Sequence, residues 1–326
     1  MRKAIVLGAS VLAAASAAAV VAARRLNSVA DWPEAPGRFT TVGSESIHHL
    51  SNSEGNGPTI VFESALSCPC TEWAWVIREL DGRLPYLAYD RPGNGWSTQH
   101  APPRTAAEHA ATLRELLSNA GLPGPYVLVG HSVGGLLART FALHHADDVA
   151  GIVLVDSSHP DQLERSALQR EGMSLVEQGI WATYWRARFG LSRPDDGFGA
   201  IGELPEHLVE PSRKVMHRPE PWAAARREFA DWYTFWANEA REAVPRADVP
   251  VAVVTAGAQS SMDLAHARMQ AELAQLTDVG SHDVVYAAEH DALVMRRELA
   301  SRVVKAVEWA VENRVAAQQP VTGRKS

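Results

Sequence analysis

Short apolar runs alternate with stretches of helical periodicity from residue 38 to about residue 311. Several of the runs are apolar at every position, as expected for strands that are covered on both faces of a parallel sheet. The runs predict strands at Phe39–Val42, Ile47–Leu50, Thr59–Glu63, Tyr86–Tyr89, Tyr126–Val129, Gly151–Val155, Val251–Thr255 and Val284–Ala287. The alternation predicts an α/β fold with a mostly parallel eight-stranded sheet, wound by right-handed crossovers.

Local signals refine this picture at three places. The first two strands are joined by the polar turn 43–46 and are expected to form an antiparallel hairpin at the sheet edge. Thr105 and Glu108 have the spacing of a capping box, which marks the start of a helix. A last helix is predicted from about Leu293 to Val311.

Residues 158–247 interrupt the alternation, because they contain no clear strand between two strongly apolar ones. This stretch holds half of the ten tryptophans, namely Trp181, Trp185, Trp222, Trp232 and Trp236. We expect a helical cap over the carboxyl edge of the sheet, where open α/β sheets bind ligands. Some of the rings should line an apolar pocket, and most should hold the cap together. The core would then comprise residues 38–157 and 248–315.

The two ends of the chain are expected to lie outside the fold. In residues 1–25, an apolar stretch from Ala4 to Ala23 is flanked on both sides by basic residues. This pattern predicts either an N-terminal membrane anchor or a cleaved signal peptide, and so a membrane-anchored or extracytoplasmic protein. Residues 26–37 are expected to form a linker, and the polar residues 316–326 a disordered tail.

The composition limits the size of the core and argues against several classes of function. The 326 residues are 46% hydrophobic, enough to bury one large core or two modest ones. The formal net charge of −7, with no basic run containing interleaved aromatic residues, argues against nucleic-acid binding. Cys68 and Cys70 are the only cysteines, too few for a disulfide framework or a zinc site. We expect them to be small loop residues, or a local disulfide in an oxidising compartment, and we expect no metal or cofactor.

The segment 130–135, Gly-His-Ser-Val-Gly-Gly, lies between a buried strand and a helical stretch. A Gly-x-Ser-x-Gly sequence in this setting is typical of a nucleophile elbow, a sharp turn that holds a serine above the sheet edge. The glycines let the strand and the helix pass closely on either side of the turn. Ser132 is therefore the candidate nucleophile.

Four motifs follow predicted strands in order: residues 62–67, Phe-Glu-Ser-Ala-Leu-Ser; residues 90–97, Asp-Arg-Pro-Gly-Asn-Gly-Trp-Ser; the elbow; and residues 288–291, Ala-Glu-His-Asp. With these motifs the chain resembles the capped α/β-hydrolases over roughly residues 38–313. It is most similar to small-ester hydrolases whose fourth-strand loop reads Asp-Arg-Pro-Gly-x-Gly-x-Ser. Fold and chemistry follow from such a resemblance more readily than substrate does.

A neutral serine needs a base to accept its proton. The resemblance implies the chain order nucleophile, acid, histidine, which places the base after the last strand and selects His290. His282 is the nearest alternative, but it lies at the start of that strand.

The acid that orients the histidine has two candidates. Asp156 ends the strand Gly151–Val155, a position from which some similar hydrolases take their acid. Asp263 follows the strand Val251–Thr255, the more common position, but it opens a helix as an N-cap would. We favour Asp156, with Asp263 as the alternative.

The resemblance also implies an oxyanion hole made by the backbone amides of Val133 and Leu66. The usual His-Gly before the second of these is replaced here by Ser64-Ala65. Each such donor is worth about 3 kcal/mol of transition-state stabilisation.

These features predict a serine hydrolase that cleaves a carboxylic ester with a small to medium apolar acyl group through an acyl-enzyme. Its partner would be a small-molecule ester, and the sequence points to no protein partner. Hydrolysis of a lactone, an amide or a carbon–carbon bond on the same triad is the alternative. An alternative of another class is a ligand-binding receptor or scaffold with little turnover.

Overall fold

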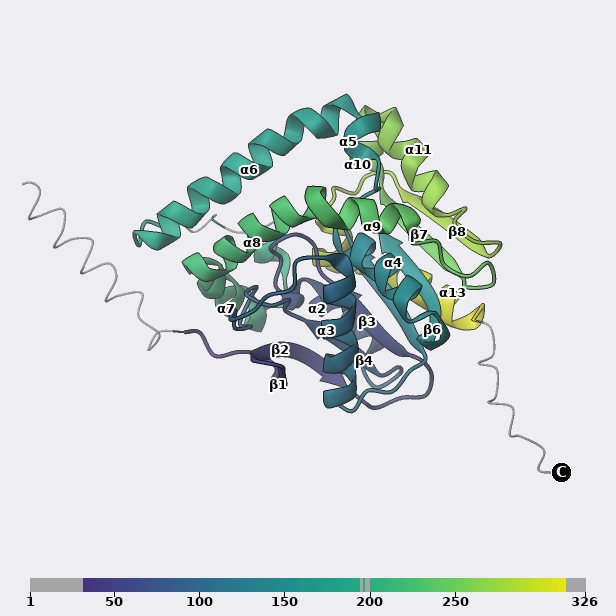
Figure 1. Ribbon diagram of the computed structural model, residues 1–326, viewed down its shortest axis with the longest axis horizontal. Helices are drawn as coiled ribbons and strands as arrows, with labels where there is room; N and C mark the ends of the chain where they lie inside the picture. The colour runs from purple at the N-terminus through teal and green to yellow at the C-terminus, as the bar shows by residue number, and fades with distance from the viewer. Residues whose placement is uncertain (1–31, 194–195, 197–199, 315–326) are drawn as a thin grey trace, which may run out of the picture.

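One eight-stranded sheet runs through the described part of the chain, residues 32–193, 196 and 200–314 of a computed structural model (Figure 1). Its strands are β1 (Arg38–Val42), β2 (Glu45–Asn52), β3 (Thr59–Glu63), β4 (Tyr86–Tyr89), β5 (Tyr126–His131), β6 (Val149–Val155), β7 (Val251–Ala256) and β8 (Gly280–Val285). The order is β1-β2-β4-β3-β5-β6-β7-β8. Only the β1–β2 and β2–β4 pairs are antiparallel. The predicted α/β fold with an edge hairpin is confirmed.

Helices cover both faces of the sheet. Along β5, Val127 and Val129 join one core, to which α2 (Ala74–Leu80) and α13 (Arg297–Glu312) contribute. Leu128 points to the opposite core, which includes residues of α3 (Ala106–Asn119) and α4 (Gly134–His144). Since neighbouring strand residues face opposite sides of a sheet, burial on both sides explains the continuous apolar runs in the sequence. A single 3₁₀ turn, Ala146–Asp148, separates α4 from β6.

Two predicted boundaries were wrong. β8 spans Gly280–Val285 rather than Val284–Ala287, because this edge strand pairs only with β7 and is partly exposed, so it needs no apolar run. The helix predicted over Leu293–Val311 is two helices, α12 (Ala292–Met295) and α13, because Arg296 has an extended backbone. The capping box at Thr105 is present and starts α3.

The described part of residues 158–247 contains helices and no strand. These helices are α5 (Gln162–Arg165), α6 (Ala167–Arg188), a short 3₁₀ turn (Ile201–Glu203), α7 (Glu206–Met216), α8 (Pro219–Asp231), the π-helical turn Trp232–Trp236 and α9 (Ala237–Glu242). In Figure 1, α6 is the long helix at the top, and it packs on α8. Trp222, Trp232 and Trp236 are buried, and Trp236 ties the insertion to the core, because its indole N–H donates to the carbonyl of Arg104 at 2.7 Å.

The expected membrane anchor or signal peptide in residues 1–25, the first part of the linker, and the tail 316–326 lie outside the described residues. Within the described ranges, no helix combines the length and the apolar character needed to cross a membrane. Cys68 and Cys70 are both buried and are not joined in a disulfide.

Candidate active site

Ser132 occupies the turn between β5 and α4 with a φ of 55°, a conformation that non-glycine residues rarely adopt. The surrounding glycines are required by close contacts. A Cβ on Gly134 would lie 2.3 Å from the carbonyl oxygen of Glu63, and one on Gly130 would lie 2.6 Å from that of Gly134. The sequence therefore forms the sharp turn that the elbow motif predicts.

Asp156 lies beside the elbow, directly after β6, and its carboxylate is fully buried. Its Oδ2 atom lies 2.6 Å from Nδ1 of His290, in the turn before α12. Its Oδ1 atom accepts the backbone N–H of Ala256 at 2.9 Å. Burial alone would raise the pKa of Asp156, but hydrogen bonds from His266 and His290 hold this pKa well below its usual range. The carboxylate is therefore ionised at neutral pH.

Burial also acts on His290, and it disfavours the charged imidazolium. The hydrogen bond and the negative charge of Asp156 act in the opposite direction and are stronger together. They raise the pKa of His290 from 6.5 to about 9. Since Asp156 binds Nδ1, the neutral ring carries its proton there and has its lone pair on Nε2.

The two alternative residues lie elsewhere. Asp263 is the N-cap of α11 (Leu264–Leu273), where it accepts the amides of Ala265 and His266. Its Oδ2 atom accepts the hydroxyl of Ser166 at 2.5 Å. His282 lies within β8, with Nε2 2.8 Å from the Thr255 hydroxyl. The structure thus brings Asp156, and not Asp263, to His290.

The two amides expected to form an oxyanion hole lie at the sheet edge. Leu66 is in the loop after β3, and Val133 precedes the first residue of α4. Among the described residues, neither amide is paired with a hydrogen-bond acceptor. Both N–H groups are therefore free to donate to an oxyanion, as an oxyanion hole requires, and that of Val133 belongs to the residue directly after Ser132.

His266, which the sequence did not single out, is a further residue of this site. It lies on α11 with its side chain only 6% exposed, and its Nε2 atom is 3.1 Å from Oδ1 of Asp156. Its Nδ1 atom lies 3.1 Å from the side-chain nitrogen of Gln169, on cap helix α6. No motif marks either residue, because 97 residues separate them in the sequence and only the tertiary structure brings them together.

A cavity of about 500 Å³ opens at the serine. Ser132, Asp156 and His290 are among the residues that line it. The helix α10 (Gly257–Met262) supplies Ala258, Gln259 and Met262. The other lining residues are Ser157, Ser158, Gln162, Leu168, Gln169, Gly172, Met173, Val176, Trp232, His266 and Glu289. The lining includes no lysine or arginine. This cavity suits an uncharged ligand with an apolar part.

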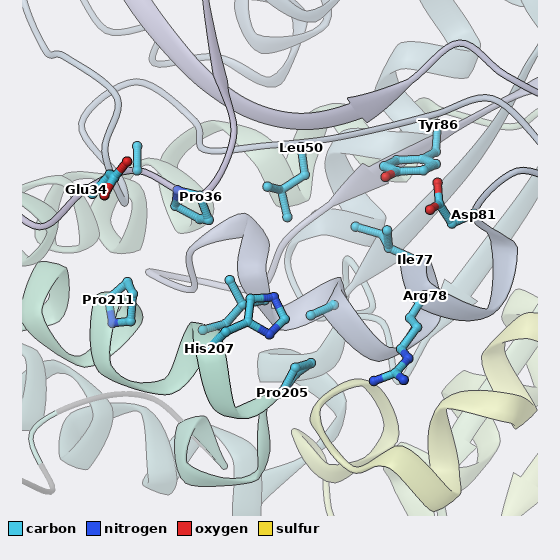
Figure 2. Close-up of a pocket in the computed structure, with 13 residues that line it drawn as sticks. Glu34, Pro36, Leu50, Ile77, Arg78, Asp81, Tyr86, Pro205, His207 and Pro211 are labelled. Carbon is cyan, nitrogen blue, oxygen red and sulfur yellow. The ribbon is translucent and has the colours of Figure 1, made fainter.

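A second pocket, of about 630 Å³, lies between α2, α7 and the strands near the hairpin (Figure 2). Arg78 and Asp81 lie on one side of it, whereas His207 comes from the α7 side. None of its lining residues is a serine, threonine or cysteine. The pocket therefore lacks a hydroxyl or thiol beside its histidine, whereas the Ser132 cavity holds both a serine and a histidine.

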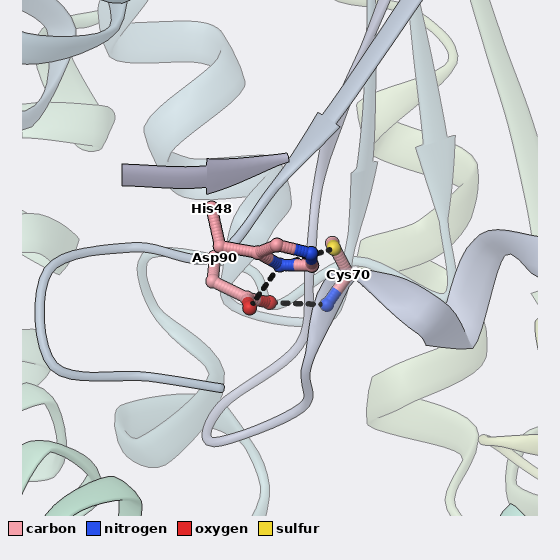
Figure 3. Close-up of side chains that lie close together, drawn as sticks. All are labelled: His48, Cys70 and Asp90. Atoms are coloured by element: carbon pink, nitrogen blue, oxygen red, sulfur yellow. Dashed lines mark hydrogen bonds and ion pairs between the residues drawn. The ribbon is translucent and has the colours of Figure 1, made fainter. Parts of the chain in front are cut away.

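His48, Cys70 and Asp90 form a fully buried group of residue types that bind metals (Figure 3). The Asp90 carboxylate already binds Nδ1 of His48 at 2.7 Å and the backbone N–H of Cys70 at 2.6 Å. These bonds tie β2 and the 3₁₀ turn Cys70–Trp73 to the loop after β4. Their chemistry is that of a structural crosslink. His131, His290 and Asp291 form a second group with ligand atoms within 4.8 Å of one another, next to Ser132.

The sheet order, the elbow and the histidine–aspartate pair define a protein class. The chain belongs to the alpha/beta hydrolase family, whose family model matches residues 60–302. An uncharacterised protein of Schizosaccharomyces pombe is 27% identical over 79% of this chain and 52% of its own length. A pimeloyl-(acyl-carrier protein) methyl ester esterase of Vibrio vulnificus is 36% identical over 32% of this chain and 39% of its own. The chain spans about half the length, or less, of the curated relatives it matches.

Solved structures agree on the fold. A putative lipase from Acinetobacter baumannii matches with a TM-score of 0.65 and 16% identity, covering 85% of this chain and 92% of the lipase. The enol-lactonase from Burkholderia xenovorans matches with a TM-score of 0.57 and 19% identity, covering 84% and 99%. Such low identities show the shared fold alone. The family model is what confirms the resemblance to the alpha/beta hydrolases.

Proposed function

We propose that this chain is a serine hydrolase that cleaves a carboxylic ester with a small to medium apolar acyl group. The observation that carries the proposal is the strained Ser132 in one cavity with His290, whose Nδ1 is bonded to the buried Asp156. Backbone strain at a cavity wall is typical of a residue held for chemistry. The esterase of Vibrio vulnificus, which shares part of the sequence, is consistent with this reaction.

In the proposed mechanism, Nε2 of His290 accepts the proton of the Ser132 hydroxyl as Oγ attacks the ester carbonyl. The amides of Val133 and Leu66 donate to the resulting oxyanion. His290 then protonates the departing alcohol, and an acyl-enzyme remains. Water, deprotonated by His290, attacks this acyl group and releases the acid. Asp156 holds the imidazole in the required tautomer and stabilises the imidazolium.

The substrate class follows from the cavity lining. Leu168, Met173 and Val176 of α6 offer an apolar wall to an acyl or alcohol group. The lining holds the exposed carboxylate of Glu289 and no lysine or arginine, so a substrate with a free carboxylate or phosphate would meet a negative charge there. A neutral ester of moderate size fits these properties best.

The test is labelling with a fluorophosphonate, a probe that reacts with activated serines, followed by intact-mass and peptide mass spectrometry. The proposal expects rapid modification of Ser132 and no labelling of the Ser132→Ala variant. Ser158→Ala is the matched control, because it removes another hydroxyl from the same cavity and should still label. A folded wild-type protein that stays unlabelled would instead favour a receptor or scaffold with little turnover.

A further inference from the structure

The loop after β3 is held by a buried guanidinium. Arg91, in the loop after β4, is 1% exposed. Its Nη1 donates to the carbonyl of Ser64 at 2.7 Å, and its Nη2 donates to the carbonyl of Ala65 at 3.0 Å. These carbonyls belong to the two residues that precede Leu66, which is expected to supply one oxyanion donor. Arg91 therefore acts on the backbone of the proposed oxyanion hole.

Peptide geometry makes this contact directional. The carbonyl of Ala65 and the N–H of Leu66 belong to one planar trans peptide unit, so they point in opposite directions. A donor that holds the carbonyl thereby sets the direction of the N–H. The preceding peptide unit is held as well, because Oε1 of Glu72 accepts the N–H of Ala65 at 2.9 Å. The loop is thus fixed by side chains at the positions where the usual His-Gly is replaced.

The other edge of the guanidinium binds the cap. Glu228 on α8 accepts Nε of Arg91 at 2.7 Å and Nη2 at 2.9 Å, a bidentate pair in which the Glu228 side chain is 6% exposed. Burial acts to raise the pKa of Glu228, but Arg91 outweighs burial and holds this pKa below its usual value. Glu63 is the other carboxylate near Arg91, at 3.6 Å, and burial raises its pKa to about 7. Glu228 is therefore the main ionic partner of Arg91.

We propose that Glu228 is a positioning residue through which the cap directs the Leu66 amide into the oxyanion hole. The path runs from Glu228 to Arg91, from Arg91 to the carbonyl of Ala65, and through that peptide unit to the amide of Leu66. The oxyanion hole is complete only when α8 packs on the core so that Glu228 binds Arg91. This inference rests on the proposed function and adds to it a dependence of turnover on the position of the cap.

The test variant is Glu228→Gln. A glutamine keeps the size of the side chain but replaces one acceptor oxygen with a donor, which breaks the bidentate pair. Arg91 is then drawn toward Glu63 and away from the two carbonyls. Removal of an oxyanion donor lowers kcat by about 100-fold to 1000-fold, so a misdirected donor should lower kcat by roughly 10-fold to 100-fold. KM should change little.

A second ion pair on the same helix provides the matched control. Asp231 of α8 binds Arg104 of the core, with Nη2 at 2.8 Å from Oδ1, and Arg104 has no contact with the loop at Ser64 and Ala65 among the described residues. Asp231→Asn also removes a charge that ties the cap to the core. It should lower the melting temperature and leave kcat unchanged.

The readout that separates positioning from stability is inhibition by a trifluoromethyl ketone. This ketone adds the Ser132 oxygen to its carbonyl carbon, passes the serine proton to His290 and forms an oxyanion, whereas the matching methyl ketone binds without addition. In Glu228→Gln, the Ki of the trifluoromethyl ketone should rise in proportion to the loss of kcat/KM. The Ki of the methyl ketone should stay the same.

Two results would overturn the inference. One is a Glu228→Gln variant with the kcat of the wild type and the wild-type ratio of the two Ki values, that of the methyl ketone over that of the trifluoromethyl ketone. The other is an Asp231→Asn variant that loses as much kcat, and as much of this ratio, as Glu228→Gln does. If Glu228→Gln does not fold, Glu228→Asp keeps the charge, moves the carboxylate back by one methylene and should give a smaller loss of the same kind. Failure of the proposed function would be visible in the wild type alone, as absence of ester turnover and of any preference for the trifluoromethyl ketone, and it would overturn the inference as well.

Discussion

His266 contacts Asp156 on the carboxylate oxygen that His290 does not use, with Nε2 3.1 Å from Oδ1. The side-chain nitrogen of Gln169 donates to Nδ1 of His266, so the proton of the neutral His266 ring lies on Nε2 and points at Asp156. Asp156, the proposed acid of the triad, therefore accepts one N–H from His290 and one from His266, whose ring is oriented by Gln169 of α6.

We expect His266→Leu to lower kcat by about 10-fold, because it removes one charge-assisted hydrogen bond from Asp156. The negative charge of Asp156 is then shared with fewer donors, so the pKa of His290 should rise and the acidic limb of the kcat/KM profile should move to higher pH. His266→Gln should restore much of the activity, since its amide N–H can replace Nε2–H. Steady-state kinetics over a pH series checks both effects.

The control for this prediction is His282→Leu, which removes a histidine bonded to Thr255 outside the cavity. That variant should lose some stability and keep the pH profile of the wild type. An unchanged profile in His266→Leu would show that His266 only supports the fold.

The two carboxylates left open by the sequence should differ sharply in kinetics. Asp156→Asn should reduce kcat by about 10⁴-fold, because the histidine loses both its orientation and its counter-charge. Asp263→Asn should keep kcat and cost at most about 1 kcal/mol of unfolding free energy, since asparagine also caps helices well. Kinetics on variants with verified circular dichroism spectra decide the point, and the reverse ranking would transfer the acid to Asp263.

The raised pKa of His290 predicts an alkaline activity profile. Only the neutral ring accepts the Ser132 proton, so kcat/KM should increase with pH until it levels off above about 9. The contribution of the raised pKa of His290 to stability has the opposite sign. It is fully present below the unfolded pKa of about 6.5 and is lost as pH rises through the folded value of about 9. A profile that levels off near neutral pH would contradict this prediction.

The cap predicts a limit on acyl length. In a series of 4-nitrophenyl esters from acetate to palmitate, each added methylene should improve kcat/KM by at most about 0.8 kcal/mol until the cavity is full. Activity should then fall abruptly. Met173→Ala shortens a side chain of α6 that lines the cavity and so enlarges the cavity. It should move the optimum to longer acyl groups. A steady improvement through palmitate would indicate an open groove and contradict the role given to the cap.

The fold was predictable because its signals are local. Strands buried on both faces produce continuous apolar runs, and a turn as tight as the one at Ser132 requires glycines at fixed offsets. The sequence signal was weakest at β8, where one free edge tolerates polar residues such as Asp283. The break at Arg296 was also missed, because the helical periodicity continues across it.

The positioning residues could not be predicted, because they are distant in sequence and lie on elements whose packing no motif records. His266 follows Asp156 by 110 residues, and Glu228 follows Arg91 by 137. In the sequence, Arg91 is only one position of the loop motif 90–97. The roles of His266 and Glu228 depend on how the inserted helices pack on the sheet, which is a property of the tertiary structure.

Three non-glycine residues in the described ranges have positive φ angles, and all three flank the proposed chemistry: Ser67, Ser132 and Asp156. Such a conformation costs about 1–3 kcal/mol at each position, and glycine would relieve it. Laboratory selection for heat resistance alone would therefore favour glycine at Ser132, whereas the bonds of Asp156 to His290, His266 and Ala256 oppose glycine there. Among thermostable variants obtained without an activity screen, replacement of Ser132 by glycine should appear first, since its hydroxyl contributes little to packing.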